Sequence, residues 1–473
     1  MGLFRRARWS CTLLMAVLPL DAQWIKLTTP HFEMYTTNTR ARALDALEIF
    51  EQARSFFDEN SPSETVTDFP IRIIAFKSEE EFRPYSPNAG AVAYYHRAYG
   101  RDYIVMRDLG PVSYPVAIHE YTHLYLAHRH LQVPIWLNEG LAEVYSTLKA
   151  SGEQLIIGSP PPARLRAARS LPLLDLRQIF GVDEDSPYYR DPALMQQFYG
   201  DSWALAHMLF LSEPYRDNFR DFLRSLNEGK GSEQSFQEIY GKSVEQVTRD
   251  LRTYISRGAT TVSSFDAQTN RRDVPELSEP TAEEAEVILA DLLSSNRETA
   301  KEAQTRLAGL AASSSSNPDV QKSLGYLALE QGKLEEAKEH FDQALRQGSN
   351  DPIMLLRYAG ALQRSGASGS QIVSLLQRAV ALKPDLLDAR FALGMEAATQ
   401  GQCVVSLSAL APIKTIQADR AFPLYSALTY CNSRLGRTGD ARHWGELARQ
   451  YAETAEQRAT VEHLLQQLNR SAR

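Results

Sequence analysis

Two histidines and a glutamate are spaced for metal chemistry in the segment His119-Glu120-Tyr121-Thr122-His123. Histidines four residues apart lie on one face of an α-helix, so both imidazoles can reach a single ion. Glu120 then points toward the open coordination position, where a carboxylate can act as a general base. The spacing predicts a zinc site of the hydrolytic kind on this helix.

A third metal ligand is expected from Glu139, which follows in the segment Trp136-Leu137-Asn138-Glu139-Gly140. Two imidazole nitrogens, one carboxylate oxygen and a fourth position open to water form the donor set of a catalytic zinc ion.

Glu143 lies one helical turn after Glu139 and is a competing third ligand. If Glu139 binds the ion, Glu143 can instead accept the outer imidazole proton of a histidine ligand and fix its tautomer.

The elements that must position these residues follow a mixed α/β pattern from Trp24 to about Ile255. Strands are expected over residues 31–36, 70–76, 91–95 and 103–106, the last two as a hairpin, and a helix over 39–60. The hairpin leads directly into the histidine helix, with Pro115 near its start. A later apolar helix contains Tyr199 and continues to Leu211.

Length and charge limit the class of protein. The chain has 473 residues, too many for one hydrophobic core, and therefore predicts two or three domains. Its net charge of -7 gives no basic excess, so neither nucleic acid nor an anionic membrane is an expected partner.

The first 22 residues have the pattern of a secretory signal peptide. Arg5, Arg6 and Arg8 precede an apolar run over residues 12–20, and the small residue Ala22 precedes the expected cleavage site. The run is too short to cross a bilayer, and no stable membrane span is expected elsewhere. The mature chain is expected to begin near Gln23 and to be exported, periplasmic or secreted.

Two cysteines, Cys403 and Cys431, remain after removal of this segment. They either form a bridge in an oxidising compartment or are two small core residues in adjacent helices.

The C-terminal part repeats every 34 or 35 residues and resembles tetratricopeptide repeats. The repeated pairs are Leu324-Gly325, Tyr358-Ala359, Leu393-Gly394 and Leu428-Thr429, with a fainter copy at Leu289-Ala290. About five helical hairpins are expected over 283–470, forming a solenoid whose concave groove binds a protein partner. The preceding stretch, 259–282, is rich in Thr, Ser and Pro and is expected to be a linker after a domain spanning 23–258.

Together, the two motifs resemble the gluzincin metallopeptidases, and most closely peptidase MA-like domains fused to tetratricopeptide repeats. The resemblance is sharpest in the metal-binding segments and looser over 24–255. It implies an α+β zincin-like (thermolysin-like) catalytic domain followed by an all-α tetratricopeptide-repeat solenoid. Glu139 lies a few residues closer to His123 than in thermolysin or aminopeptidase N.

By this resemblance, His119, His123 and Glu139 hold Zn²⁺ and Glu120 activates the zinc-bound water against a peptide bond. Tyr199 is the expected catalytic donor to the oxyanion, or alternatively a packed tyrosine with a hydrogen-bonded hydroxyl. Glu143 supports the site from outside the metal ligands.

Three functions remain open. The first is a zinc endopeptidase acting on a peptide or protein substrate, with repeats that recruit the substrate or a partner. The second is a non-catalytic repeat-based binding or scaffold protein with a degenerate zincin domain. The third is a zinc hydrolase acting on another substrate, such as a cell-wall peptide. The presence of Glu120 favours an enzyme, since a structural site needs no base.

Overall fold

The structure is a computed structural model that describes residues 24–60, 70–97, 101–129, 131–151, 154–259, 261–266, 274–294, 296, 298–313, 316–413 and 418–471. The expected signal peptide lies outside the described residues. Among the described helices, none is sufficiently long and apolar to cross a membrane.

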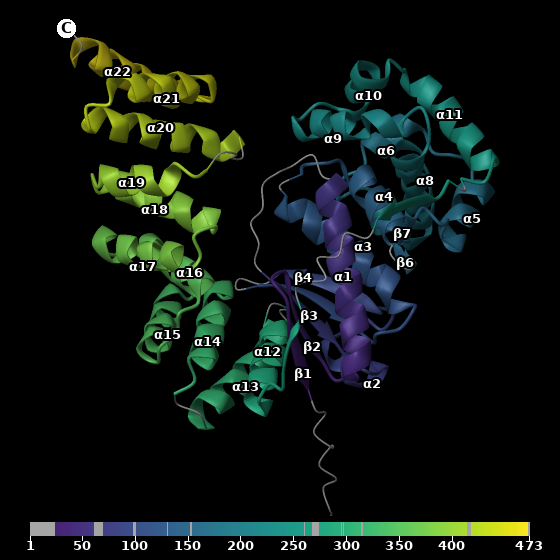
Figure 1. Ribbon diagram of the computed structural model, residues 1–473, viewed down its shortest axis with the longest axis horizontal. Helices are drawn as coiled ribbons and strands as arrows, with labels where there is room; N and C mark the ends of the chain where they lie inside the picture. Colours follow the sequence, from purple (N-terminus) through teal and green to yellow (C-terminus); the bar gives the residue numbers. More distant parts are fainter. Residues whose placement is uncertain are drawn as a thin grey trace, which may run out of the picture.

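A six-stranded sheet forms the centre of the N-terminal domain, in the order β4-β5-β3-β2-β1-β9 (Figure 1). Strands β2, β3 and β5 are parallel, whereas β4 runs antiparallel to β5 and β1 antiparallel to β2. The strands are β1 (Ile25–Thr28), β2 (Phe32–Thr36), β3 (Ile71–Ala75), β4 (Ala93–Arg97), β5 (Asp102–Met106) and β9 (Glu276–Ser278). The predicted strands and hairpin are confirmed, with β4 displaced two residues toward the C-terminus.

Side chains alternate between the two faces of the sheet along each strand. Each face packs against its own hydrophobic core. Phe32 and Met34 of β2 belong to one hydrophobic core, whereas Tyr35 belongs to another. The first core contains helices α1 (Arg40–Asn60) and α3 (Ser113–His128). The second contains α12 (Ala282–Ser294).

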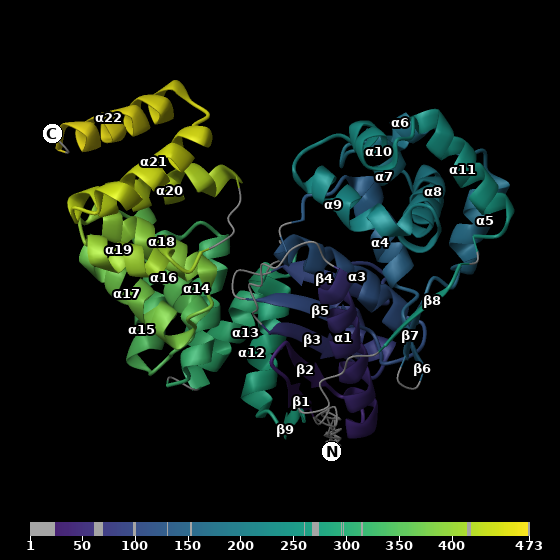
Figure 2. The same ribbon diagram turned by 45° about the horizontal axis from the view of Figure 1, so that its top comes forward.

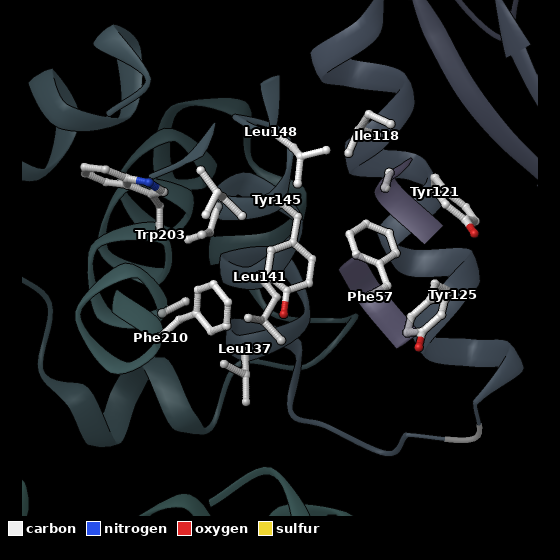
Figure 3. Packing of buried hydrophobic residues seen from close by; sticks show 14 of the residues in the cluster. Phe57, Ile118, Tyr121, Tyr125, Leu137, Leu141, Tyr145, Leu148, Trp203 and Phe210 are labelled. Carbon is white, nitrogen blue, oxygen red and sulfur yellow. The ribbon is translucent and has the colours of Figure 1, made fainter. Parts of the chain in front are cut away.

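Helices α4 (Ile135–Tyr145) and α8 (Pro192–Leu211) pack behind α3 in the first core. Figure 3 shows this packing, in which Phe57 of α1 lies next to Tyr145 of α4, with Phe210 of α8 beyond it. The rings of Phe57 and Tyr145 are stacked, with 5.0 Å between their centroids. The histidine helix is thus held on a rigid apolar base.

The rest of this domain is mainly helical and includes a small second sheet of order β6-β7-β8. Its further elements are α2 (Glu79–Phe82), β6 (Lys149–Ser151), β7 (Gln154–Ile157), α5 (Pro162–Ser170), α6 (Leu176–Phe180), α7 (Pro187–Arg190), α9 (Phe219–Asn227), α10 (Ser232–Tyr240), α11 (Val244–Ser256) and β8 (Ser263–Asp266).

The segment 259–282 differs from the expected linker, because it contains two strands. Strand β8 pairs with β7, and β9 pairs with β1, so the segment extends both sheets. Strands of three or four residues are too short to produce a periodic pattern, and their pairing depends on open sheet edges far away in the sequence. The other expected domain limits stay predictions.

The C-terminal part is a solenoid of helical hairpins, as the repeat predicts. Helices α12 to α21 form five successive hairpins within the described residues, and α22 follows them (Figures 1 and 2). The helices after α12 are α13 (Ala300–Ser313), α14 (Pro318–Glu330), α15 (Leu334–Arg346), α16 (Pro352–Arg364), α17 (Gly369–Leu382), α18 (Leu387–Thr399), α19 (Cys403–Leu410), α20 (Ala418–Arg434), α21 (Thr438–Gln450) and α22 (Ala455–Ser471).

Small residues at the repeated positions allow the paired helices to approach closely. A Cβ atom on Gly325 of α14 would lie 2.5 Å from the ring of Phe341 in α15. Cys403 and Cys431 are free, buried thiols in the core shared by α19 and α20. In the structure, the two cysteines are therefore core residues and form no disulfide bridge with each other.

Candidate metal centre

Helix α3 places both histidines on the same side. Its residues Ala117, Ile118 and Tyr121 are buried in the core, whereas the His119 and His123 side chains remain 15% and 22% exposed. The two imidazole rings lie 4.8 Å apart between centroids. The 3.6-residue period thus anchors one face of α3 in the core and directs the nitrogen donors to another.

Helix α4 brings Glu139 to these rings. Its Oε2 lies 3.5 Å from His119 Nε2 and 3.6 Å from His123 Nε2. In a tetrahedral site with metal–ligand distances of about 2.1 Å, neighbouring ligand atoms are roughly 3.4 Å apart. The carboxylate oxygen therefore already lies at a separation from both nitrogens that one zinc ion requires. Among the described residues, His119, His123 and Glu139 are the group that could hold a metal ion.

The surroundings of Glu139 also fit a cation. The residue is 4% exposed, and its buried Oε2 has no hydrogen-bond partner within the described part of the chain. Burial raises the pKa of this carboxyl, but the neighbouring imidazoles of His119 and His123 outweigh burial and lower it. An ionised, buried oxygen without a donor is costly unless a cation satisfies it.

Glu143 lies beside the outer nitrogen of His119. Its Oε1 lies 3.7 Å from His119 Nδ1, on the far side of the ring from Glu139, and 2.6 Å from Arg164 Nη2. Asn138 has the corresponding place at the other histidine, with its Oδ1 2.7 Å from His123 Nδ1. Such contacts orient imidazole ligands and fix their tautomers. Sequence reasoning missed the parts played by Asn138 and Arg164.

Glu120 lies beside this group but makes a different contact. Its Oε2 accepts a hydrogen bond from the backbone N–H of Tyr95 in β4, at 3.3 Å. Burial raises the pKa of Glu120, and the nearby charges of His119 and His123 only partly oppose it. Strand β4 is the edge of the sheet nearest α3, so the carboxylate joins the histidine helix to this edge.

Two tyrosines, Tyr189 and Tyr199, lie beside Glu139. The hydroxyl of Tyr189 in α7 donates to Glu139 Oε1 at 3.0 Å. Tyr199 of α8 has a raised pKa, first through burial and then through the charge of Glu139. The Arg164 guanidinium lies over the Tyr199 ring, 5.0 Å from its centroid. Sequence reasoning named Tyr199 and missed Tyr189, because a four-residue helix gives no periodic signal.

Gly140 explains how α4 holds Glu139 at this place. A Cβ atom on this residue would lie 2.5 Å from the Ser202 carbonyl oxygen and 2.7 Å from the Ala206 Cβ, both on α8. The absence of a side chain lets the two helix backbones approach closely. The neighbouring Glu139 is thereby fixed between α3 and α8.

Comparison with known proteins finds similar chains among solved structures. No family model matches the chain, and no curated protein matches it. Among solved structures, the chain is similar to YrrB, a TPR protein described as having an unusual peptide-binding site. The two sequences are 21% identical, the match covers 37% of this chain and 90% of YrrB, and the TM-score is 0.33. It is also similar to pilF of Pseudomonas aeruginosa, with 18% identity, 40% and 91% covered, and a TM-score of 0.29. PilW, a type IV pilus biogenesis factor, has 15% identity, 41% and 92% covered, and a TM-score of 0.29.

These comparisons correct the expectation of an enzyme. The similar structures include two TPR proteins and a type IV pilus biogenesis factor, and none of their descriptions names a peptidase. The prediction of a gluzincin-type zinc metallopeptidase is therefore overturned, whereas the site roles expected of Glu120 and Tyr199 stay predictions. The physical reason is that the histidine spacing specifies where nitrogen donors meet, and a non-catalytic ion can use the same donors. The zincin-like fold of the N-terminal domain stays a prediction.

Proposed function

We propose that this chain is a non-catalytic binding or scaffold protein whose helical repeats bind a protein partner. The observation that carries the proposal is the series of five helical hairpins from α12 to α21 within the described residues. Stacked repeats bury their cores between neighbours and leave an extended surface for a ligand. The peptide-binding site in the description of YrrB supports the same use of such repeats here.

The N-terminal domain, in this proposal, holds one Zn²⁺ through His119, His123 and Glu139. Support comes from the 3.5 and 3.6 Å separations and from the buried Glu139 Oε2, which has no hydrogen-bond partner within the described residues. A bound zinc ion would supply positive charge between α3 and α4 and so add its binding energy to the stability of the domain. Arg164 holds Glu143 in place, and Asn138 holds His123.

Export of the chain is part of the same proposal. The charged start, apolar run and small residue over 1–22 support it. The partner would then be an exported or surface protein, met after the signal peptide is removed.

A displayed peptide library, selected on the chain from Gln23 onward, tests the binding function. We expect selected peptides to bind saturably, to remain intact by mass spectrometry, and to protect amide hydrogens of α14 to α20 from exchange. Bound peptides order the groups they contact, and protection locates those groups.

Protection confined to the N-terminal domain, or cleavage of the selected peptides, would contradict this proposal. The control is the same selection on the chain unfolded in denaturant, which removes the solenoid surface and should enrich no common sequence.

A further inference from the structure

A cavity lies where the first repeats meet the N-terminal domain. It is on the face of the central sheet that does not pack against α3. It has a volume of about 340 Å³. Tyr35, Arg72 and Tyr103 contribute from the sheet, Asp291 from α12 and Tyr326 from α14. Figure 2 shows α12 beside the sheet, with α14 following it in the solenoid. The cavity is thus built by both parts of the chain.

Carboxylates outnumber cations in its wall. Four cations face it, Lys26, Arg72, Arg101 and Lys322. Six carboxylates face it, Glu33, Glu284, Asp291, Asp319, Glu330 and Asp351. A recessed site with this surplus attracts positive charge, because low-dielectric walls strengthen the field of the lining groups.

The cations of the wall are engaged with particular carboxylates. Arg72 and Arg101 both pair with Glu33, at 2.8 and 3.1 Å. Lys322 pairs with Asp319 at 2.6 Å and with Asp351 at 3.1 Å.

Asp291 takes part in none of these ion pairs. The cations that act on it, Arg72 and Lys322, are engaged elsewhere. Burial raises the pKa of Asp291, and the Ser323 hydroxyl and these two cations oppose the rise only in part. A cation placed beside this carboxylate would compensate for the loss of water around it.

Tyr326 provides a second, independent sign of a ligand. Its side chain is 8% exposed, yet its buried hydroxyl has no hydrogen-bond partner within the described residues. Burial raises the pKa of this phenol well above its ordinary value, so it stays neutral and its oxygen can accept. An N–H donor entering the cavity would satisfy this oxygen and could rest against the ring.

We propose that this cavity accepts one basic side chain, lysine or arginine, of the protein that binds the repeats. The inference rests on the proposed function and specifies the chemistry of the partner. The ammonium or guanidinium group pairs with Asp291 and donates to the Tyr326 hydroxyl. A cavity of this size is at the small end of ligand sites and suits a single side chain.

Calorimetric titration of the chain from Gln23 onward with small probes tests this inference. The probes are N-acetyl-arginine amide, N-acetyl-lysine amide and the neutral N-acetyl-citrulline amide. We expect saturable binding of one or both basic probes and none of citrulline, because only the basic probes carry the required charge. The stronger of the two identifies the preferred side chain.

Asp291→Asn should weaken binding of the basic probes about tenfold, the usual cost of losing a charged hydrogen bond. Tyr326→Phe should weaken it a few-fold and deletes only one oxygen atom, so it remains informative if Asp291→Asn fails to fold. The matched control is Asp385→Asn on the solenoid surface, where the side chain is 63% exposed, and it should bind as the wild type does.

Equal binding of citrulline and arginine, no saturable binding, or unchanged affinity in a folded Asp291→Asn or Tyr326→Phe chain would each overturn the inference. The proposed function has a separate readout. If selected peptides protect the repeats while the basic probes do not bind, the cavity assignment alone fails.

Discussion

Replacing Gly140 with alanine should separate the two helices that hold Glu139. The added Cβ would lie 2.5 Å from the Ser202 carbonyl oxygen and 2.7 Å from the Ala206 Cβ. Both contacts are on α8, and the first is with backbone, which cannot rotate away. Helix α4 must therefore move outward, carrying Glu139 away from its place between His119 and Tyr189.

The magnitude follows from two opposing effects. Overpacking of this kind costs up to about 3 kcal/mol, since the obstacle is backbone. Alanine is better than glycine inside a helix by about 1 kcal/mol. The net loss is about 2 kcal/mol, or roughly 4–8 °C in the unfolding temperature of a domain of this size.

Tryptophan fluorescence during thermal unfolding measures this loss, because Trp136 of α4 and Trp203 of α8 are fully buried. The control is Gly360→Ala in α16, where a Cβ would meet no atom within 4 Å. That variant should gain about 0.5–1 kcal/mol from reduced backbone entropy of the unfolded chain. If Gly140→Ala unfolds at or above the wild-type temperature, the close contact of α4 with α8 does not hold the site as argued.

Three further outcomes are expected. Glu139→Gln should abolish stoichiometric zinc measured by plasma mass spectrometry, whereas Glu143→Gln should retain the ion with about 10–100-fold weaker affinity; equal zinc in the two variants would refute the assigned ligand. Burial raises the pKa of Asp201 from 3.8 to about 7, so the folded chain keeps a proton that the unfolded chain releases. Stability should therefore fall between about pH 4 and pH 7, by up to about 4 kcal/mol, and Asp201→Asn should remove this dependence in denaturant titrations; an unchanged slope would contradict it. Cys403 and Cys431 should resist a thiol reagent in the folded chain and both react in denaturant without reductant, since they are buried and free; fewer than two reactive thiols after unfolding would indicate a bridge.

Short-range periodicity accounts for what could be predicted well. The strands at 32–36 and 71–75 and the helix at 40–60 follow from alternating or helical apolar spacing. The solenoid follows from a period of 34 or 35 residues, because each repeat packs mainly on its neighbours. In these regions the pattern and the contacts involve nearby residues.

The same argument covers part of the candidate site. His119 and His123 share a side of α3 because four residues nearly complete a helical turn. That spacing indicates a metal and leaves the reaction open, which is why the predicted peptidase was the wrong conclusion. Function depends on groups that helical spacing alone does not specify.

Long-range packing decided the rest. Glu139 rather than Glu143 lies at both Nε2 atoms because Gly140 lets α4 pack closely on α8. Tyr189 reaches the same carboxylate from an element without a local signal.

The amino-acid order thus determines the histidine pair and the repeats, since each depends on periodicity along one stretch of chain. The cavity at Asp291 and Tyr326 exists only after α12 closes over the sheet, bringing together strands and helices that are more distant in sequence. Burial then raises the pKa values of Asp291 and Tyr326 and leaves the Tyr326 hydroxyl without a hydrogen-bond partner among the described residues. Because burial and charge pairing arise between distant segments, they appear only in the folded chain.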